Sequence, residues 1–114
     1  MRSYILTTYP VVHSEESLPY AVKIQVDDRI ISYSGDTEWT DVLIDVAKNA
    51  DLFICGTNFF ERESTGHLNY QNIVQNKHKL ECKKLLLTHL GEEMLNNLSQ
   101  VKMEYAEDGD VISV

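Results

Sequence analysis

The chain has 114 residues and a mass of 13.1 kDa, which predicts a single domain spanning residues 1–114. It carries 18 acidic and 10 basic residues, a formal net charge of −8, so it lacks the basic character that dominates binding to nucleic acid or anionic membranes. No stretch approaches the roughly 18 apolar residues of a transmembrane helix, and residues 1–9 lack the apolar core of a signal peptide. We therefore expect a cytoplasmic globular protein with no nucleic-acid or membrane partner.

Three strands are predicted in the first third of the chain, over residues 4–12, 20–26 and 29–33. Pro10 indicates that the first of these is an edge strand or ends irregularly. A polar loop over residues 14–18 separates it from the second strand. Asp27 and Asp28 predict a tight turn that joins the second and third strands in a hairpin.

From Glu38 onward the apolar residues recur at helical spacing. We expect helices over 38–49, 68–80 and 92–98, and strands over 52–55, 84–88, 101–105 and 111–114. Asp36 or Thr37 is a candidate N-cap for the first helix, and the polar loop over residues 56–66 has the length of a functional loop. Early hairpins followed by β-α-β units predict an α/β (α+β) protein with a mixed sheet and helices on at least one face.

Two potential ligands follow strands of this sheet, at the carboxyl ends where α/β proteins place their ligands. Asp36 follows the strand over residues 29–33, and His89 follows the strand over residues 84–88. A carboxylate and an imidazole together suit zinc, iron or manganese. Two simpler interpretations stay open: Asp36 as a helix N-cap, and His89 as an ordinary histidine at a strand end. The two cysteines, Cys55 and Cys82, match neither zinc-finger nor redox spacing and are expected to be buried free thiols.

Five segments resemble, in order, the motifs of the metallo-β-lactamase fold family. They are Ile-Ser-Tyr-Ser-Gly-Asp-Thr over 31–37, Ala-Asp-Leu-Phe-Ile-Cys over 50–55, Gly-His-Leu over 66–68, Leu-Leu-Leu-Thr-His-Leu over 85–90, and Ala-Glu-Asp-Gly-Asp-Val-Ile over 106–112. The match runs over residues 3–114 and points to the ribonuclease Z-like and phosphodiesterase-like branch. It implies the C-terminal half of an αββα sandwich, with a mixed sheet and helices on one face.

The resemblance also implies roles for four residues. Asp36 corresponds to the aspartate that bridges two metal ions, zinc or manganese, and His89 to a ligand of the second ion. His67 corresponds to a group near the scissile bond, acting as general acid or phosphate contact, although a simple loop histidine is the alternative. His13 resembles a histidine of the strand before the hairpin that is not a ligand, and we assign it to the substrate side.

Two departures from the family pattern bear on activity. The family's His-x-His-x-Asp-His signature is absent, and Gly56 stands where many members have a glutamate that orients a ligand histidine. Asp36 and His89 alone are too few to hold two metal ions. We therefore expect weak or no zinc binding and no hydrolysis of a phosphodiester or small-molecule substrate by this chain alone. A complementary N-terminal half or a homo-oligomer is the expected partner, and a non-catalytic interaction or dimerisation module is the alternative function.

Overall fold

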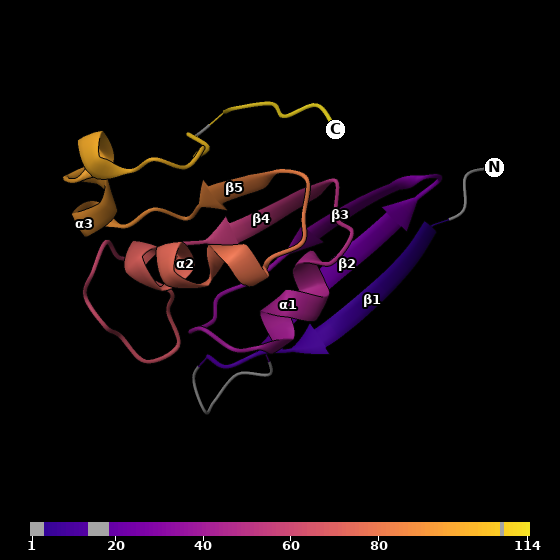
Figure 1. Cartoon of the computed structure of the whole chain (residues 1–114), viewed down its shortest axis with the longest axis horizontal. Helices are drawn as coiled ribbons and strands as arrows, with labels where there is room; N and C mark the ends of the chain where they lie inside the picture. Colours follow the sequence, from indigo (N-terminus) through magenta and orange to yellow (C-terminus); the bar gives the residue numbers. More distant parts are fainter. Residues whose placement is uncertain (1–3, 14–18, 108) are drawn as a thin grey trace.

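Five strands form one mixed sheet in the computed structural model, which describes residues 4–13, 19–107 and 109–114 (Figure 1). The strands are β1 (Tyr4–Pro10), β2 (Tyr20–Val26), β3 (Arg29–Tyr33), β4 (Leu52–Gly56) and β5 (Leu85–Thr88). They lie in the order β1-β2-β3-β4-β5, with the first three antiparallel and β3, β4 and β5 parallel. The predicted mixed sheet is confirmed, and β1 lies at its edge, as Pro10 indicated.

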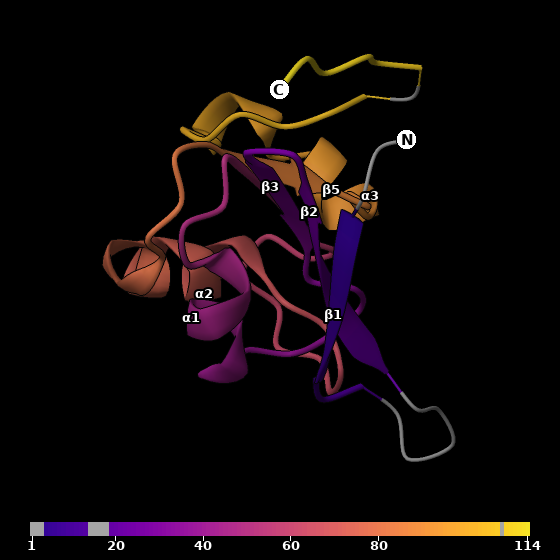
Figure 2. The same ribbon diagram turned by 90° about the vertical axis from the view of Figure 1, so that its right-hand side faces the viewer.

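The helices α1 (Val42–Ala47) and α2 (Tyr70–Asn76) cover the same face of this sheet (Figure 2). The short helix α3 (Glu92–Leu95) lies beyond the carboxyl end of β5. The core forms between the two covering helices and the sheet, where Leu43, Phe53 and Ile73 are almost completely buried. Strand β4, which lies between β3 and β5, is buried along nearly its whole length, as expected for a parallel strand with a neighbour on each side.

The first helix begins at Val42 rather than near Glu38, and neither Asp36 nor Thr37 caps it. Thr37 and Glu38 instead bond to Val12, just after β1. The Val12 N–H donates to the Thr37 hydroxyl oxygen at 3.0 Å, and the Glu38 N–H donates to the Val12 carbonyl at 2.9 Å. The N-cap interpretation is therefore wrong, because a tertiary contact takes the groups that a helix start would use.

The other two helices are also shorter than predicted. The Asn69 side chain accepts the Asn72 N–H at 2.8 Å in a reciprocal capping box, so α2 begins at Tyr70. It passes into a 3₁₀ turn over Lys77–Lys79. Likewise, α3 covers only four residues, and a 3₁₀ turn over Leu98–Gln100 follows it.

The predicted strands over 101–105 and 111–114 do not form in the described part of the chain. The C-terminal segment makes one bridge to the sheet, between Leu87 and Tyr105, in which the Leu87 N–H donates to the Glu104 carbonyl and the Ala106 N–H donates to Leu87. Beyond it, Val111 is 91% and Val114 45% exposed, and only Ile112 of the last four residues is partly buried. The predicted loop over residues 14–18 lies outside the described residues.

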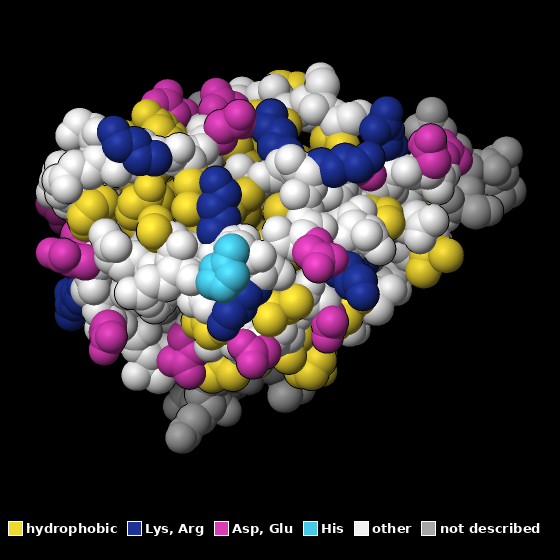
Figure 3. All heavy atoms as spheres, in the orientation of Figure 1, with side chains coloured by type: hydrophobic (Ala, Val, Ile, Leu, Met, Phe, Trp, Pro, Cys, Tyr) yellow, Lys and Arg dark blue, Asp and Glu magenta, His cyan; other side chains and the backbone are white. Residues whose placement is uncertain are grey.

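The face of β1 and β2 that points away from the helices exposes a strip of apolar side chains. Lys23 donates to carbonyls of the α1 region, so its side of β2 faces the helices, and residues of alternate parity point to the other face. That outer strip contains Tyr4, Leu6, Tyr20 and Ile24, each at least 36% exposed. The helix-bearing face carries acidic and basic side chains interspersed with apolar ones (Figure 3).

Candidate functional site

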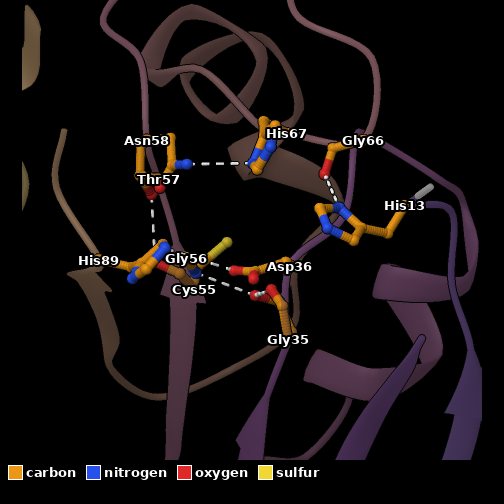
Figure 4. A network of polar contacts seen from close by, with 11 residues as sticks. His13, Gly35, Asp36, Cys55, Gly56, Thr57, Asn58, Gly66, His67 and His89 are labelled. Carbon is orange, nitrogen blue, oxygen red and sulfur yellow. Dashed lines mark hydrogen bonds and ion pairs between the residues drawn. The ribbon is translucent and has the colours of Figure 1, made fainter. Parts of the chain in front are cut away.

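Polar side chains collect at the carboxyl ends of β3, β4 and β5, where parallel strands end at one edge of the sheet. Asp36 follows β3, Asn58 follows β4, and His89 directly follows β5 (Figure 4). His89 adopts a left-handed backbone with φ of 55°, a conformation that histidine visits infrequently. The fold therefore presents this imidazole from a strained turn at the rim.

The structure brings Asp36 and His89 together. The Nε2 atom of His89 lies 3.7 Å from Oδ1 of Asp36, and the two side chains are 57% and 41% exposed. This separation is too long for a hydrogen bond but short enough for an ion pair when His89 is protonated. The pair is thus held in proximity and remains accessible from solvent.

Ser34 and Gly35 shape the turn after β3 that presents Asp36. The Ser34 hydroxyl donates to the Gly35 carbonyl at 2.8 Å and accepts the Gly56 N–H at 2.9 Å, which ties the β3 and β4 ends together. Gly35 has φ of 67°, and a Cβ there would lie 2.7 Å from the Tyr20 carbonyl oxygen. The turn that presents Asp36 therefore requires glycine at position 35.

His13 and His67 form a second cluster on the same rim. The His13 Nδ1 lies 2.8 Å from the carbonyl oxygen of Gly66, and the two imidazole rings meet edge to face with centroids 4.9 Å apart. A Cβ on Gly66 would lie 2.8 Å from the His13 Nδ1. The Thr37 and Glu38 contacts with Val12 place His13 here, so the segment that carries Asp36 also positions this histidine.

Asn58 is a site residue that the sequence analysis missed. Its Nδ2 lies 3.0 Å from Nδ1 of His67, whose ring also meets the Phe59 ring edge to face at 5.9 Å. The available signal was its position two residues beyond a buried strand that ends at the same edge as Asp36. An amide at such a place can orient a neighbouring imidazole.

Two hollows flank these residues. One of about 690 Å³ adjoins His89, and Asn58, Leu95, Tyr105 and Glu107 contribute to its lining. The other, of about 360 Å³, is lined in part by His67. The polar rim therefore borders spaces large enough for parts of a small substrate.

The donors on the rim fit part of a metal site. Carboxylate oxygen and imidazole nitrogen are ordinary ligands of zinc and manganese, and Asp36 and His89 supply one of each. Across residues 4–13, 19–107 and 109–114, no three His, Cys, Asp or Glu side chains converge closely enough to hold a metal ion. Asp36 and His89 thus match the chemistry of a metal centre but not its full ligand number.

Neither cysteine adds a thiolate to this set. Both are free, Cys55 being buried beneath the rim and Cys82 half-buried. Burial raises the pKa of the Cys55 thiol to about 12, despite hydrogen bonds with Ser34 and Thr57 that act in the opposite direction. Burial also raises the pKa of Cys82. Both side chains are therefore neutral thiols near neutral pH.

Comparison with known proteins gives one relative by sequence. The probable metallo-hydrolase YhfI of Bacillus subtilis (strain 168) is 30% identical over 91 residues, which cover 77% of this chain and 35% of YhfI. No protein-family model matches the chain. This chain therefore spans about a third of the length of its curated relative.

Solved structures show the fold. The crystal structure of the metallo-β-lactamase fold protein YhfI from Bacillus subtilis matches 90% of this chain and 45% of its own, with a TM-score of 0.71 and 24% identity. Human tRNase Z, short form, matches 96% of this chain and 42% of its own (TM-score 0.71, 20% identity). Zn²⁺-bound PqqB from Methylobacterium extorquens matches 99% and 50% (TM-score 0.71, 12% identity).

These matches identify the chain as part of a metallo-β-lactamase fold. It is related in sequence to a protein of that fold named as a metallo-hydrolase, and it covers half or less of each structure it resembles. Among the described residues, no helix is both long and apolar enough to cross a bilayer.

Proposed function

We propose that this chain supplies part of the active site of a metal-dependent hydrolase. The observation that carries the proposal is the 3.7 Å approach of Asp36 and His89 at the carboxyl edge of a metallo-β-lactamase-fold sheet. Zinc or manganese suits these donors, and one structural neighbour is a zinc-bound protein. A phosphodiester or another small hydrolysable substrate is the proposed class.

His13 has two candidate roles in this proposal: the substrate-side role that the sequence suggested, and that of a further metal donor in the completed site, since the described residues of this chain alone bring no three donors together. The Gly66 carbonyl can only accept a hydrogen bond, so the His13 Nδ1 at 2.8 Å donates to it. That leaves Nε2 with a free lone pair, the form in which histidines commonly bind metals while a backbone carbonyl orients them. Metal binding weakened by His13→Ala would support the donor role, whereas a higher KM with unchanged metal affinity would return His13 to the substrate side.

His67 is the proposed proton donor or phosphate contact. Its ring borders the 360 Å³ hollow and is held by Asn58 and Phe59. A bound divalent ion would supply Lewis-acid activation of water and of the scissile group. His67 then offers the second function that hydrolysis requires, a proton for the leaving oxygen.

Complementation tests the proposal. With zinc or manganese present, the chain alone should not cleave bis(p-nitrophenyl) phosphate above background, because among its described residues no three donors converge on one position, as a catalytic metal requires. Adding a fragment that carries a His-x-His-x-Asp-His segment should restore turnover. That turnover should disappear in Asp36→Ala and His89→Ala and fall more modestly in His67→Ala. Turnover by the isolated chain that is lost in both Asp36→Ala and His89→Ala would contradict the half-site account.

A second candidate function is a non-catalytic interaction module, and the apolar strip of Tyr4, Leu6, Tyr20 and Ile24 favours it. Contiguous exposed apolar surface is characteristic of interfaces. The proposed occupant is a second copy of the chain or a complementary half-domain. Light scattering should show a dimer that Leu6→Asp converts to a monomer, whereas Val74→Asp, at an exposed apolar residue of α2, should leave it dimeric. A wild-type monomer at micromolar concentration would argue against self-association.

A further inference from the structure

His13 and His67 lie side by side, but their ring nitrogens have different partners. The ring centroids are 4.9 Å apart, and the planes are inclined at 87°. Each Nδ1 atom has one defined contact within hydrogen-bond distance: a backbone carbonyl for His13 and a side-chain amide nitrogen for His67. The chemistry of these two partners decides where each imidazole carries its proton.

The partner of His67 can only donate. The Nδ2 of Asn58 carries two N–H groups and no lone pair available for hydrogen bonding, and it lies 3.0 Å from Nδ1 of His67. The neutral His67 ring must therefore accept at Nδ1, which leaves its proton on Nε2. His13 has the opposite arrangement, because the Gly66 carbonyl accepts from its Nδ1.

The backbone of Asn58 is fixed by the neighbouring loop. The Gly91 N–H donates to the Asn58 carbonyl at 3.0 Å, and the Thr57 N–H donates to the Thr88 carbonyl at 2.8 Å. A Cβ on Gly91 would lie only 2.5 Å from the Asn58 carbonyl oxygen, so the contact is tightly packed. These bonds tie Asn58 to the segment that carries His89, and its amide reaches His67 from a rigid base.

We propose that Asn58 is a positioning residue that keeps the proton of neutral His67 on Nε2. Neutral His13, by contrast, carries its proton on Nδ1. A carboxylate in the same place would accept rather than donate, and it would move the His67 proton to Nδ1. Asn58 thus keeps the proton of His67 on Nε2, in a ring that packs edge to face against the His13 imidazole, whose Nε2 has an open lone pair. The catalytic use of this proton rests on the proposed function, whereas the tautomer pair does not.

The test reads the tautomers directly. Two-bond ¹H–¹⁵N correlation spectra of the metal-free chain, recorded near pH 9 where an ordinary histidine is neutral, distinguish protonated from bare ring nitrogens. Wild-type His67 should be protonated at Nε2, and His13 at Nδ1. Asn58→Asp should invert the His67 tautomer, and Asn58→Leu should give a mixture. Asn96→Leu, at an exposed asparagine after α3, should change neither ring.

The wild-type spectrum alone can contradict the inference, so the test remains decisive even if a variant does not fold. His67 protonated at Nδ1 would contradict it, as would an Asn58→Asp variant that folds and keeps the wild-type tautomer. The outcome is separable from that of the proposed function. Tautomers as stated, with no metal-dependent turnover after complementation, would leave the inference standing and remove the hydrolase proposal.

Discussion

A carboxylate lies at each end of the parallel part of the sheet, and the two have very different surroundings. Asp51, just before β4, accepts the Ile30 N–H at 2.8 Å and pairs with Lys83 at 3.0 Å and Arg29 at 3.6 Å. Asp36, at the opposite end, has a histidine 3.7 Å away and a side chain that is 41% exposed. One carboxylate has its acceptor capacity used within the fold, whereas the other is held open at the rim.

The difference separates a structural acid, Asp51, from Asp36, the acid that we propose as a metal ligand. Hydrogen bonds and cationic partners hold the pKa of Asp51 below its ordinary value, with the Ile30 N–H contributing most. A site that is to bind a metal or substrate must instead leave oxygen lone pairs accessible.

Exchanging each carboxylate for alanine should have the largest effect and separate the two roles. Asp36→Ala should abolish the turnover restored by complementation and change the free energy of unfolding by less than about 0.5 kcal/mol, as expected for a partly exposed side chain. Asp51→Ala should clearly lower the free energy of unfolding, because it leaves the Ile30 N–H and two cations without their partner. Urea unfolding followed by circular dichroism measures the free energy of unfolding of each variant. Equal destabilisation by the two variants would remove the distinction.

The pH dependence of stability should follow Asp51. Its pKa is lower in the folded state than the ordinary 3.8, so its stabilising contribution is present above about pH 4 and is lost as pH falls through the folded-state pKa. Asp51→Asn should therefore flatten the acid limb of a plot of unfolding free energy against pH. Asp36→Asn serves as the matched control. An acid limb unchanged by Asp51→Asn would show that other groups dominate acid unfolding.

The cysteines offer a chemical probe of the same two ends. Cys55 is 1% exposed beneath the rim with a pKa of about 12, whereas Cys82, near the Asp51 end, is half-buried with a pKa raised by burial. Iodoacetamide near pH 8 should modify Cys82 first, slowly, and leave Cys55 unmodified until the protein unfolds. Mass spectrometry of peptides over time gives the order. Modification of native Cys55 before Cys82 would contradict the packing described beneath the rim.

The smallest expected effect is on Tyr33, at the end of β3. Burial raises its pKa above the ordinary value, and the negative charge of Asp36 raises it further. Asp36→Asn should therefore lower the pKa of Tyr33 while leaving it elevated by burial. Titration followed by ¹³C NMR of the tyrosine ring carbons resolves this residue from the other five tyrosines. Asp51→Asn should leave the pKa unchanged.

The local pattern of the sequence predicted the sheet well and its connections less well. The predicted strands over 20–26 and 29–33 coincide with β2 and β3, because alternation and a turn signal are local properties. Placing Asp36 and His89 at the same edge followed from the strands that precede them. The helix start failed because Thr37 bonds to Val12, a residue 25 positions away that no local pattern connects to it.

The same limit applies to the candidate site. Asn58 and His67 meet across a loop, and their contact depends on how the loop returns to the rim. His13 is placed at the site by the bond of its neighbour Val12 to Thr37, 25 positions away, and by its own contact with Gly66, 53 positions away. The edge at which residues that follow strands lie was therefore predictable, whereas the contacts that orient their side chains were not.

Manganese titration followed by NMR tests the central claim, that the carboxyl-end rim is the metal-binding part of this chain. Paramagnetic Mn²⁺ broadens signals near its binding position even when binding is weak. Broadening should centre on Asp36 and His89, be lost in Asp36→Ala, and spare residues around Asp51. Broadening that centres on Asp51, or that persists unchanged in Asp36→Ala, would contradict the account.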